Sequence, residues 1–352
     1  MSKKNNQKQL KRRAKLKQEA EYKGQKEPVI LNKDLVNKLE EGNEYLSLIN
    51  LKPTTFNNNA IHETIRHIEL IRNRPAVCYV ANIARAIPNT ILDYTDILPF
   101  MTMVGSIPKD SQAIDIILAT PGGNIEIADF FAKQLRLRFR EIGFIIPSMC
   151  MSAGTVFCLS GDEIIMDENA YLGPTDPQML SNDLKRRFPG QTLQTIISDI
   201  QKRGEEKLKK KELPDWTDII ELNNIDLKEL GYIKMASQLS IDLVEEYLRK
   251  YKFKNWTHHS GTNLEVTEDA RKTRAREIAT KLCNNECWKT HNRLISRTVA
   301  HEECWLQITH PEDIDGLNNA IKQFWTVVYW IIEHSNVQKI YATNSNCLFK
   351  NC

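Results

Sequence analysis

Two short motifs in the middle of the chain combine residue types that can carry out acyl transfer. The first is Pro121-Gly122-Gly123, which ends the apolar run Ile114–Leu118, and the second is the small-residue stretch around Ser152, which follows the apolar run Ile142–Ile146. A serine at the start of a helix lies beside unpaired backbone N–H groups and the positive end of the helix dipole. Such donors stabilise the oxyanion that forms when a serine attacks an acyl carbon. Ser152 is therefore a candidate nucleophile.

The glycine turn adds a second source of donors. Glycine allows the backbone to approach a substrate closely, so the Gly122-Gly123 turn could supply the second donor of an oxyanion hole. The two motifs lie about 30 residues apart with one crossover helix between them, which is the spacing of neighbouring parallel strands. The alternative is structural, with Ser152 as a helix N-cap beside an ordinary turn. The co-occurrence of the two motifs favours a catalytic site.

Hydrophobic periodicity around these motifs predicts an α/β fold. Continuous apolar runs indicate strands that are buried on both faces, and apolar residues at helical spacing indicate helices between them. The expected strands are Ala76–Ala81, Ile114–Leu118, Ile142–Ile146 and Glu163–Met166. The expected helices are Asn32–Leu48, Asn59–Arg72, Tyr94–Met103, Ile125–Phe139, Val156–Leu159, Leu193–Lys211, Thr267–Cys283 and Leu317–His334.

Three segments resemble a known family: TPGG at 120–123, MSAGT at 151–155 and DEIIMDENAYLGPTDPQ at 162–178. They are similar to the Clp-protease/crotonase-type serine peptidases, in particular the serine dehydrogenase proteinase group, which is related to signal peptide peptidase A and ClpP. The resemblance implies stacked ββα units, Ser152 as nucleophile, and an oxyanion hole lined by Gly122 or Gly123 together with Ala153. It also implies peptide or protein substrates and a homo-oligomer. The chain departs from the family pattern at Ala119, where a histidine is expected before the TPGG turn.

A serine nucleophile needs a neighbour that accepts its proton. In ClpP-like relatives the catalytic histidine stands in the region that matches 169–178, but this chain has Thr175 and Asp176 there and no histidine. Relatives of the signal peptide peptidase type use a lysine about 40–50 residues after the serine, and a lysine acts as a base when burial keeps its amine neutral. In this chain that window is Leu193–Lys202, and its only lysine is Lys202, which we predict as the general base.

Other bases remain open. Lys185 lies nearer the turn, while His291 and His259 belong to a later segment that could also reach Ser152. Lys202 begins a charge-rich run, which is typical of a solvated helix face. Asp176 could orient a base or hold its turn by side-chain hydrogen bonds.

A zinc site is a further alternative. Cys283, Cys287 and His291 are spaced four residues apart, with His301 and Cys304 beyond them. Zinc binds thiolate and imidazole ligands, but this spacing is more typical of a packed helix face than of a zinc knuckle. We therefore expect no metal and no cofactor.

Composition and charge outline the rest of the chain. The 352 residues carry a net charge of +3, yet residues 1–27 hold ten Lys/Arg against three Glu. This basic arm could contact nucleic acid or an anionic membrane surface. Eight cysteines show no disulfide-like framework, so we expect a cytoplasmic protein, with membrane association open as for relatives of this family. The expected division is a basic arm 1–27, a helical linker 28–75, a catalytic domain 76–250, a helical C-terminal extension 251–342 and a loose tail 343–352.

The leading prediction is a serine peptidase. One rival is a catalytically inactive relative that uses the fold as a scaffold for a partner. The other is an acyl-CoA enzyme, because crotonases share the oxyanion hole but use carboxylates in place of a serine. Fold alone does not decide between them. The sequence contains no phosphate-binding G-x4-G-K-[ST] pattern, so ATP dependence would have to come from a partner.

Overall fold

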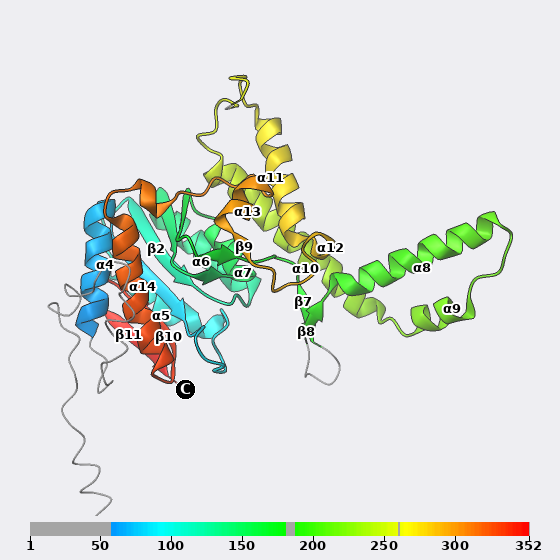
Figure 1. Ribbon diagram of the computed structural model, residues 1–352, viewed down its shortest axis with the longest axis horizontal. Helices are drawn as coiled ribbons and strands as arrows, with labels where there is room; N and C mark the ends of the chain where they lie inside the picture. Colours follow the sequence, from blue (N-terminus) through cyan, green and yellow to red (C-terminus); the bar gives the residue numbers. More distant parts are fainter. Residues whose placement is uncertain (1–57, 181–186, 260, 352) are drawn as a thin grey trace, which may run out of the picture.

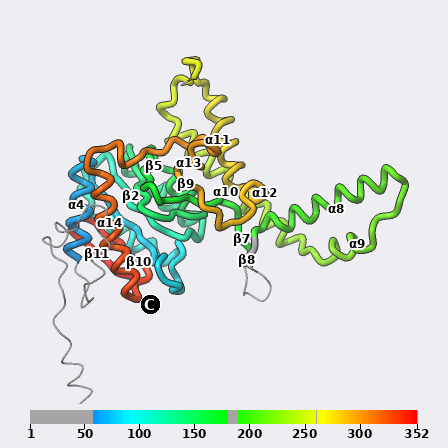
Figure 2. The backbone as a smooth tube through the Cα atoms, viewed as in Figure 1, coloured from blue at the N-terminus to red at the C-terminus, as the bar shows by residue number. Residues whose placement is uncertain are grey.

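The computed structural model describes residues 58–180, 187–259 and 261–351, and its centre is a mostly parallel β-sheet (Figures 1 and 2). The sheet has six strands in the order β11-β10-β1-β2-β3-β5. Four strands run parallel, whereas β10 is antiparallel to β1, and β11 is antiparallel to β10. The strands are β1 (Ala76–Ala81), β2 (Ala113–Ala119), β3 (Glu141–Ile146), β5 (Glu163–Met166), β10 (Val337–Ala342) and β11 (Cys347–Asn351).

Helices cover both faces of this sheet, giving three layers (Figure 1). Alternate strand residues face opposite layers, so Tyr79 belongs to one core and Cys78 to the other. The first core contains residues of α5 (Ile97–Gly105), α6 (Ile125–Arg138) and α7 (Ala153–Cys158), and η1 (Tyr94–Asp96) directly precedes α5. The second contains α4 (Asn58–Arg72) and α14 (Leu317–Glu333), which lie side by side. Burial on both faces explains the continuous apolar strand sequences.

A small second sheet lies beside α7 and has the order β4-β6-β9. Its strands are β4 (Met149–Cys150), β6 (Tyr171–Leu172) and β9 (Ile295–Ser296). β6 runs parallel to β4 and antiparallel to β9. The small sheet therefore joins chain segments that are more than a hundred residues apart in sequence.

The remaining elements form a projecting arm and a helical cap. The arm consists of α8 (Gln191–Lys209) and α9 (Trp216–Asn223), which extend away from the body in Figure 1. α10 (Leu227–Tyr247) and α11 (Glu268–Cys283) pack against each other, and residues of both join the core around α7. The short elements are β7 (Gln178–Leu180), β8 (Arg187–Pro189), η2 (Leu248–Lys252), α12 (Asn285–Trp288), α13 (Arg297–Glu302) and η3 (Pro311–Asp313).

The predicted α/β fold is confirmed, and each strand predicted around the two motifs is present within one or two residues. The C-terminal part differs from the prediction. Residues 347–351, expected in a loose tail, form β11, and β10 and α14 belong to the central layers. Polar residues within 337–351 hide this hairpin from an analysis of hydrophobic periodicity. The basic arm 1–27 and the predicted helix Asn32–Leu48 lie outside the described residues.

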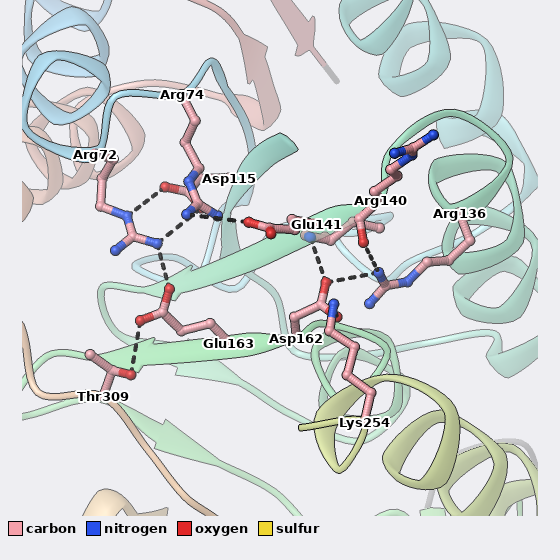
Figure 3. A network of polar contacts seen from close by, with 11 residues as sticks. Arg72, Arg74, Asp115, Arg136, Arg140, Glu141, Asp162, Glu163, Lys254 and Thr309 are labelled. Carbon is pink, nitrogen blue, oxygen red and sulfur yellow. Dashed lines mark hydrogen bonds and ion pairs between the residues drawn. The ribbon is translucent and has the colours of Figure 1, made fainter. Parts of the chain in front are cut away.

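Ion pairs hold the amino ends of the parallel strands together (Figure 3). The Arg72 guanidinium, at the end of α4, lies 2.8 Å from Asp115 Oδ2 and 2.5 Å from Glu163 Oε2. Asp115 is fully buried at the start of β2, and a Cβ atom on Gly143 of β3 would overlap its carboxylate. Arg72 therefore links one helix to β2 and β5, and glycine at 143 leaves space for the buried carboxylate.

A second polar group surrounds Asp162, beside the same sheet edge (Figure 3). Its carboxylate lies 2.8 Å from Arg136 Nη1 and 2.6 Å from Lys254 Nζ, and it accepts the Ile142 N–H at 2.7 Å. Burial by itself raises the pKa of Asp162, but Lys254, Arg136 and the backbone N–H together hold the pKa below its ordinary value. The carboxylate consequently stabilises the fold in its charged form.

This arrangement predicts an acid-dependent contribution to stability. Because the folded-state pKa of Asp162 is lowered, its contribution is present above the ordinary carboxyl pKa of about 4 and is lost as pH falls through the folded-state value. We expect Asp162→Asn to reduce the free energy of unfolding by about 1–3 kcal/mol at pH 7. The difference from the wild type should shrink on acidification from about pH 5 to pH 3.

Urea unfolding across this pH range measures the effect. The exposed Asp110 provides a matched control, and Asp110→Asn should leave stability unchanged. A loss in Asp162→Asn that stays constant with pH would contradict the assigned role of the charge.

Candidate active site

Ser152 occupies a strained turn between β4 and α7. Its backbone angles are φ 52° and ψ −120°, a region that non-glycine residues rarely adopt. Its side chain makes no capping hydrogen bond to α7, although it precedes the first helical residue. A strained serine between a strand and a helix is the geometry that exposes a nucleophilic hydroxyl in hydrolases with a nucleophile elbow. The hydroxyl is therefore available for chemistry.

The Gly122 turn touches this elbow directly. Gly122 has φ +92°, and a Cβ atom there would lie 2.5 Å from Met151 O and 2.7 Å from Ser152 Cβ. Thr120, two residues before Gly122, pairs with β4: its N–H donates to Met149 O at 2.9 Å, and its carbonyl accepts the Met151 N–H at 3.0 Å. The end of β2 thus continues along β4, and only glycine fits where the two turns meet.

Two backbone N–H groups at this contact lack a protein acceptor within the described residues. The Gly122 N–H is occupied, because it donates to Thr120 Oγ1 at 3.2 Å. Gly123 is bracketed by Leu92, whose N–H donates to Gly122 O at 2.7 Å and whose carbonyl accepts the Asn124 N–H at 2.8 Å. Those bonds leave the N–H groups of Gly123 and Ala153 free of acceptors in the described chain. Within the described residues, these two N–H groups are thus available to an added acceptor.

The small second sheet places two more polar residues at the same end as the elbow. Cys150 of β4 pairs with Leu172 of β6, and Leu172 pairs with Ile295 of β9. Ser152 follows this row by two residues and Asp176 by four, on parallel strands. His291 precedes Ile295 by four residues, and because β9 is antiparallel it lies beyond the same end of the sheet.

Asp176 and His291 form a close pair there. His291 Nδ1 lies 2.8 Å from Asp176 Oδ1, and the Asp176 side chain is 0 % exposed whereas that of His291 is 17 % exposed. The second carboxylate oxygen, Oδ2, accepts from Gln178 Nε2 at 3.2 Å and from Asn285 Nδ2 at 3.4 Å. In the neutral imidazole this contact places the proton on Nδ1 and leaves Nε2 as a basic nitrogen.

Neighbouring elements fix these two turns relative to one another. The Thr155 hydroxyl in α7 lies 2.8 Å from the Cys150 carbonyl and accepts the Gly173 N–H at 3.0 Å. Further along the same turn, the Thr175 N–H donates to the Leu282 carbonyl of α11 at 2.9 Å. The helical cap therefore holds the Asp176 turn against the elbow.

The predicted site residues fall into two groups. Ser152, Gly122, Gly123 and Ala153 lie together at the contact described above. Lys202 lies on the projecting helix α8, with its side chain 71 % exposed and its ammonium 3.6 Å from Asp199.

The remaining alternative bases are Lys185 and His259. Lys185 lies outside the described residues. His259 packs edge-on against Trp256, with ring centroids 5.2 Å apart, in the connection between α10 and α11.

The cysteines give no support to the zinc site that was weighed as an alternative. Burial raises the pKa of the Cys283 thiol to about 12, with Asp176 adding to the shift, so a thiolate there is disfavoured. Cys287 is exposed on α12, and His291 is paired with Asp176. In the described part of the chain, no three His, Cys, Asp or Glu side chains are grouped so that they could hold a metal ion.

The pairing of Asp176 with His291 is the feature that sequence reasoning did not single out. The sequence suggested each residue separately as an alternative, and it did not suggest their contact because 115 positions separate them. The local signal is a histidine four residues before an isoleucine-serine pair, and nothing in that pattern reveals that β9 pairs with β6.

Together the layered sheet, the strained serine and the free backbone donors define a ClpP/crotonase-like protein with the framework of a serine hydrolase site. The profile of the ClpP-like SDH-type serine proteinases matches residues 63–292. The chain belongs to this family. The match ends one residue after His291 and excludes α14 and the C-terminal hairpin.

Two curated proteins of Methanocaldococcus jannaschii are similar to parts of the chain. The uncharacterized protein MJ0137 is 38% identical over 118 residues, which is 34% of this chain and 37% of that protein. The uncharacterized protein MJ1495 is 31% identical over 169 residues, which is 48% of this chain and 53% of that protein. The chain thus spans about half or less of the length of the curated relatives it matches.

Two solved structures have similar segments. A variant of the 1510-N membrane-bound stomatin-specific protease has a TM-score of 0.25 and 18% identity, covering 33% of this chain and 59% of that one. A monofunctional enoyl CoA isomerase from M. smegmatis has a TM-score of 0.23 and 14% identity, covering 60% of this chain and 92% of that one. Among the described helices of the present protein, none combines the length and apolar character needed to span a bilayer.

The contact at Gly122 yields a test of the site geometry. Because an added Cβ atom would overlap the elbow, Gly122→Ala should lower the free energy of unfolding by about 1–3 kcal/mol and displace Ser152. Gly231→Ala is the control, since Gly231 lies within α10 with no atom near its added Cβ, and it should raise stability by up to about 1 kcal/mol. Urea unfolding measures both variants. Equal stability of Gly122→Ala and the wild type would refute the close contact.

Proposed function

We propose that the protein is a serine peptidase in which Ser152 is the nucleophile, His291 the general base and Asp176 the residue that orients His291. The observation that carries this proposal is the His291–Asp176 pair at the same end of the small sheet as the strained Ser152. Membership of a serine proteinase family supports the reaction class. Peptides or proteins are the corresponding substrates.

The first half of the reaction forms an acyl-enzyme. The Ser152 hydroxyl oxygen attacks the carbonyl carbon of a peptide bond while its proton passes to Nε2 of His291. The carbonyl electron pair moves to oxygen, and the N–H groups of Gly123 and Ala153 donate to the resulting oxyanion. When the oxyanion collapses, the C–N bond breaks and the leaving amine takes the proton from His291. Asp176 stabilises the intervening imidazolium.

The second half reverses these roles with water. His291 accepts a proton from a water molecule, which attacks the ester carbon of the acyl-enzyme. The same backbone donors stabilise the second oxyanion. The bond to the Ser152 oxygen then breaks, Ser152 regains its proton from His291, and the carboxylic product leaves.

This proposal gives the role of base to His291 rather than to Lys202. A lysine must be largely desolvated to be neutral near pH 7, whereas the Lys202 side chain is mostly exposed and faces Asp199. A histidine is partly neutral there without burial. The contact with Asp176 also fixes the imidazole so that one nitrogen remains basic.

The test is covalent labelling by a fluorophosphonate together with turnover of a fluorogenic peptide library. We expect the adduct at Ser152, and we expect Ser152→Ala to abolish labelling and turnover. His291→Ala and Asp176→Asn should each slow labelling at least about 100-fold, because a general base contributes that much or more. Lys202→Ala and the matched histidine control His259→Ala should stay within about twofold of the wild type.

The outcomes separate the candidate functions. Loss of activity in Lys202→Ala with full activity in His291→Ala would restore the Ser–Lys alternative. Absence of Ser152-dependent labelling and turnover in the folded wild type would favour the inactive scaffold. Turnover of an acyl-CoA thioester that survives Ser152→Ala would favour the crotonase-like enzyme.

The broader expectations stay predictions. They are the homo-oligomer, the cytoplasmic or membrane-associated location and the contacts of the basic arm 1–27.

A further inference from the structure

A buried lysine of the C-terminal hairpin reaches the loop that borders the glycine turn. Lys339 of β10 is 0 % exposed. Its ammonium lies 2.6 Å and 2.7 Å from the two carboxylate oxygens of Asp96 and donates to the Ile91 carbonyl at 2.7 Å. Both partners belong to the segment between β1 and α5, so Lys339 holds this segment at two points.

The strand register explains why the lysine points there. Lys339 pairs with Ala81 and Tyr341 pairs with Tyr79, so their side chains share the face of the sheet that packs on α5 and α6. Asp96 also accepts O–H groups from Tyr79 at 2.8 Å and from Tyr341 at 2.7 Å. The buried carboxylate is thereby fully surrounded by donors.

Stability alone gives little reason for this ion pair. A buried pair costs desolvation energy, and apolar residues of similar volume often stabilise a fold equally well or better. The pair instead restrains geometry, because the ammonium fixes the Ile91 carbonyl and the Asp96 carboxylate at defined positions. Its place in the fold therefore points to a positioning role.

The Ile91 contact leads directly to the candidate oxyanion hole. The next residue, Leu92, donates its N–H to Gly122 O at 2.7 Å and accepts the Asn124 N–H at 2.8 Å. These two bonds bracket Gly123, and a Cβ atom on Gly123 would overlap the Leu92 backbone. Movement of Ile91 consequently shifts the peptide that carries the Gly123 N–H.

We propose that Lys339 is a positioning residue that sets the Gly123 N–H for oxyanion stabilisation. The inference rests on the proposed function, because it assigns the dependence of that reaction on a residue beyond the 63–292 family match. The lysine acts through Ile91 and Leu92 and does not touch the substrate. Through Lys339, strand β10 is thus part of the catalytic framework.

The expected effect lies in the chemical step. Removal of a whole oxyanion donor lowers kcat by about 100- to 1000-fold, so a displaced donor should cost less, about 10- to 100-fold. KM should change by less than about twofold, because the oxyanion exists only in the transition state and in the intermediates. Affinity for a peptide aldehyde, which forms a tetrahedral adduct with the serine, should fall in parallel with kcat.

The experiment uses the full chain with Asp96→Asn/Lys339→Met, a double variant that removes both buried charges. Lys350→Met is the matched control, because Lys350 also approaches Asp96, at 3.4 Å, but makes no contact with Ile91. It should keep wild-type kcat. Hydrogen exchange of the Leu92 and Asn124 amides should speed up in the double variant and stay unchanged in the control.

Tyr341→Phe gives a second, milder variant that keeps the core volume and both charges. It removes one donor to Asp96 and should lower kcat about threefold, again at constant KM. This variant decides the question if the double variant does not fold.

The outcomes distinguish this inference from the proposed function. If the wild type shows no Ser152-dependent turnover, both the proposed function and the positioning role of Lys339 are overturned. Wild-type kcat and unchanged amide exchange in the folded double variant, or in Tyr341→Phe if the double variant does not fold, overturn only the positioning role. A parallel loss of kcat and of unfolding free energy in Lys350→Met would also overturn it, because the hairpin would then act through general stability.

Discussion

The close contact between the Gly122 turn and the Ser152 elbow is the constraint on which the rest of the site depends. Two chain turns meet with no room for a single added methyl group, at the carboxyl ends of the β2 and β3 segments of the sheet. Close packing holds Ser152 in a backbone conformation that costs about 1–3 kcal/mol by itself. The same contact keeps the Ala153 and Gly123 N–H groups near the serine. The strain at Ser152, the position of the two N–H groups and the need for glycine at position 122 thus all follow from this one contact.

The two ends of the parallel sheet serve different purposes. Charged side chains neutralise one another at the amino ends, where Arg72 joins Asp115 and Glu163 (Figure 3). The carboxyl ends instead carry glycine turns and backbone donors without protein partners among the described residues. Ligand sites of open α/β sheets lie at the carboxyl ends of their strands. In the proposed function, the unpaired backbone groups at the carboxyl edge are the ones that meet a substrate.

Sequence reasoning captured what is encoded locally. The apolar runs of β2 and β3 and the serine between small residues each specify their own conformation, so the fold and the elbow could be predicted. The Asp176–His291 pair could not, because it depends on the pairing of β6 with β9, two-residue strands with no periodicity of their own. The Lys339–Asp96 pair could not be predicted for the same reason. A lysine in β10 is expected to be exposed unless the pairing of β10 with β1 is known.

The contrast between Lys202 and His291 shows how architecture restricts the choice of base. A helix that leaves the body, as α8 does, cannot desolvate an amine along its exposed face, and desolvation is what a lysine base requires. A histidine requires only orientation, which the buried Asp176 carboxylate provides at 2.8 Å. A buried partner can orient an imidazole that is itself partly exposed to solvent. A partly exposed imidazole can contact both a substrate and an incoming water molecule. In the proposed reaction, the small sheet that joins β4, β6 and β9 therefore favours an accessible histidine base over a buried lysine base.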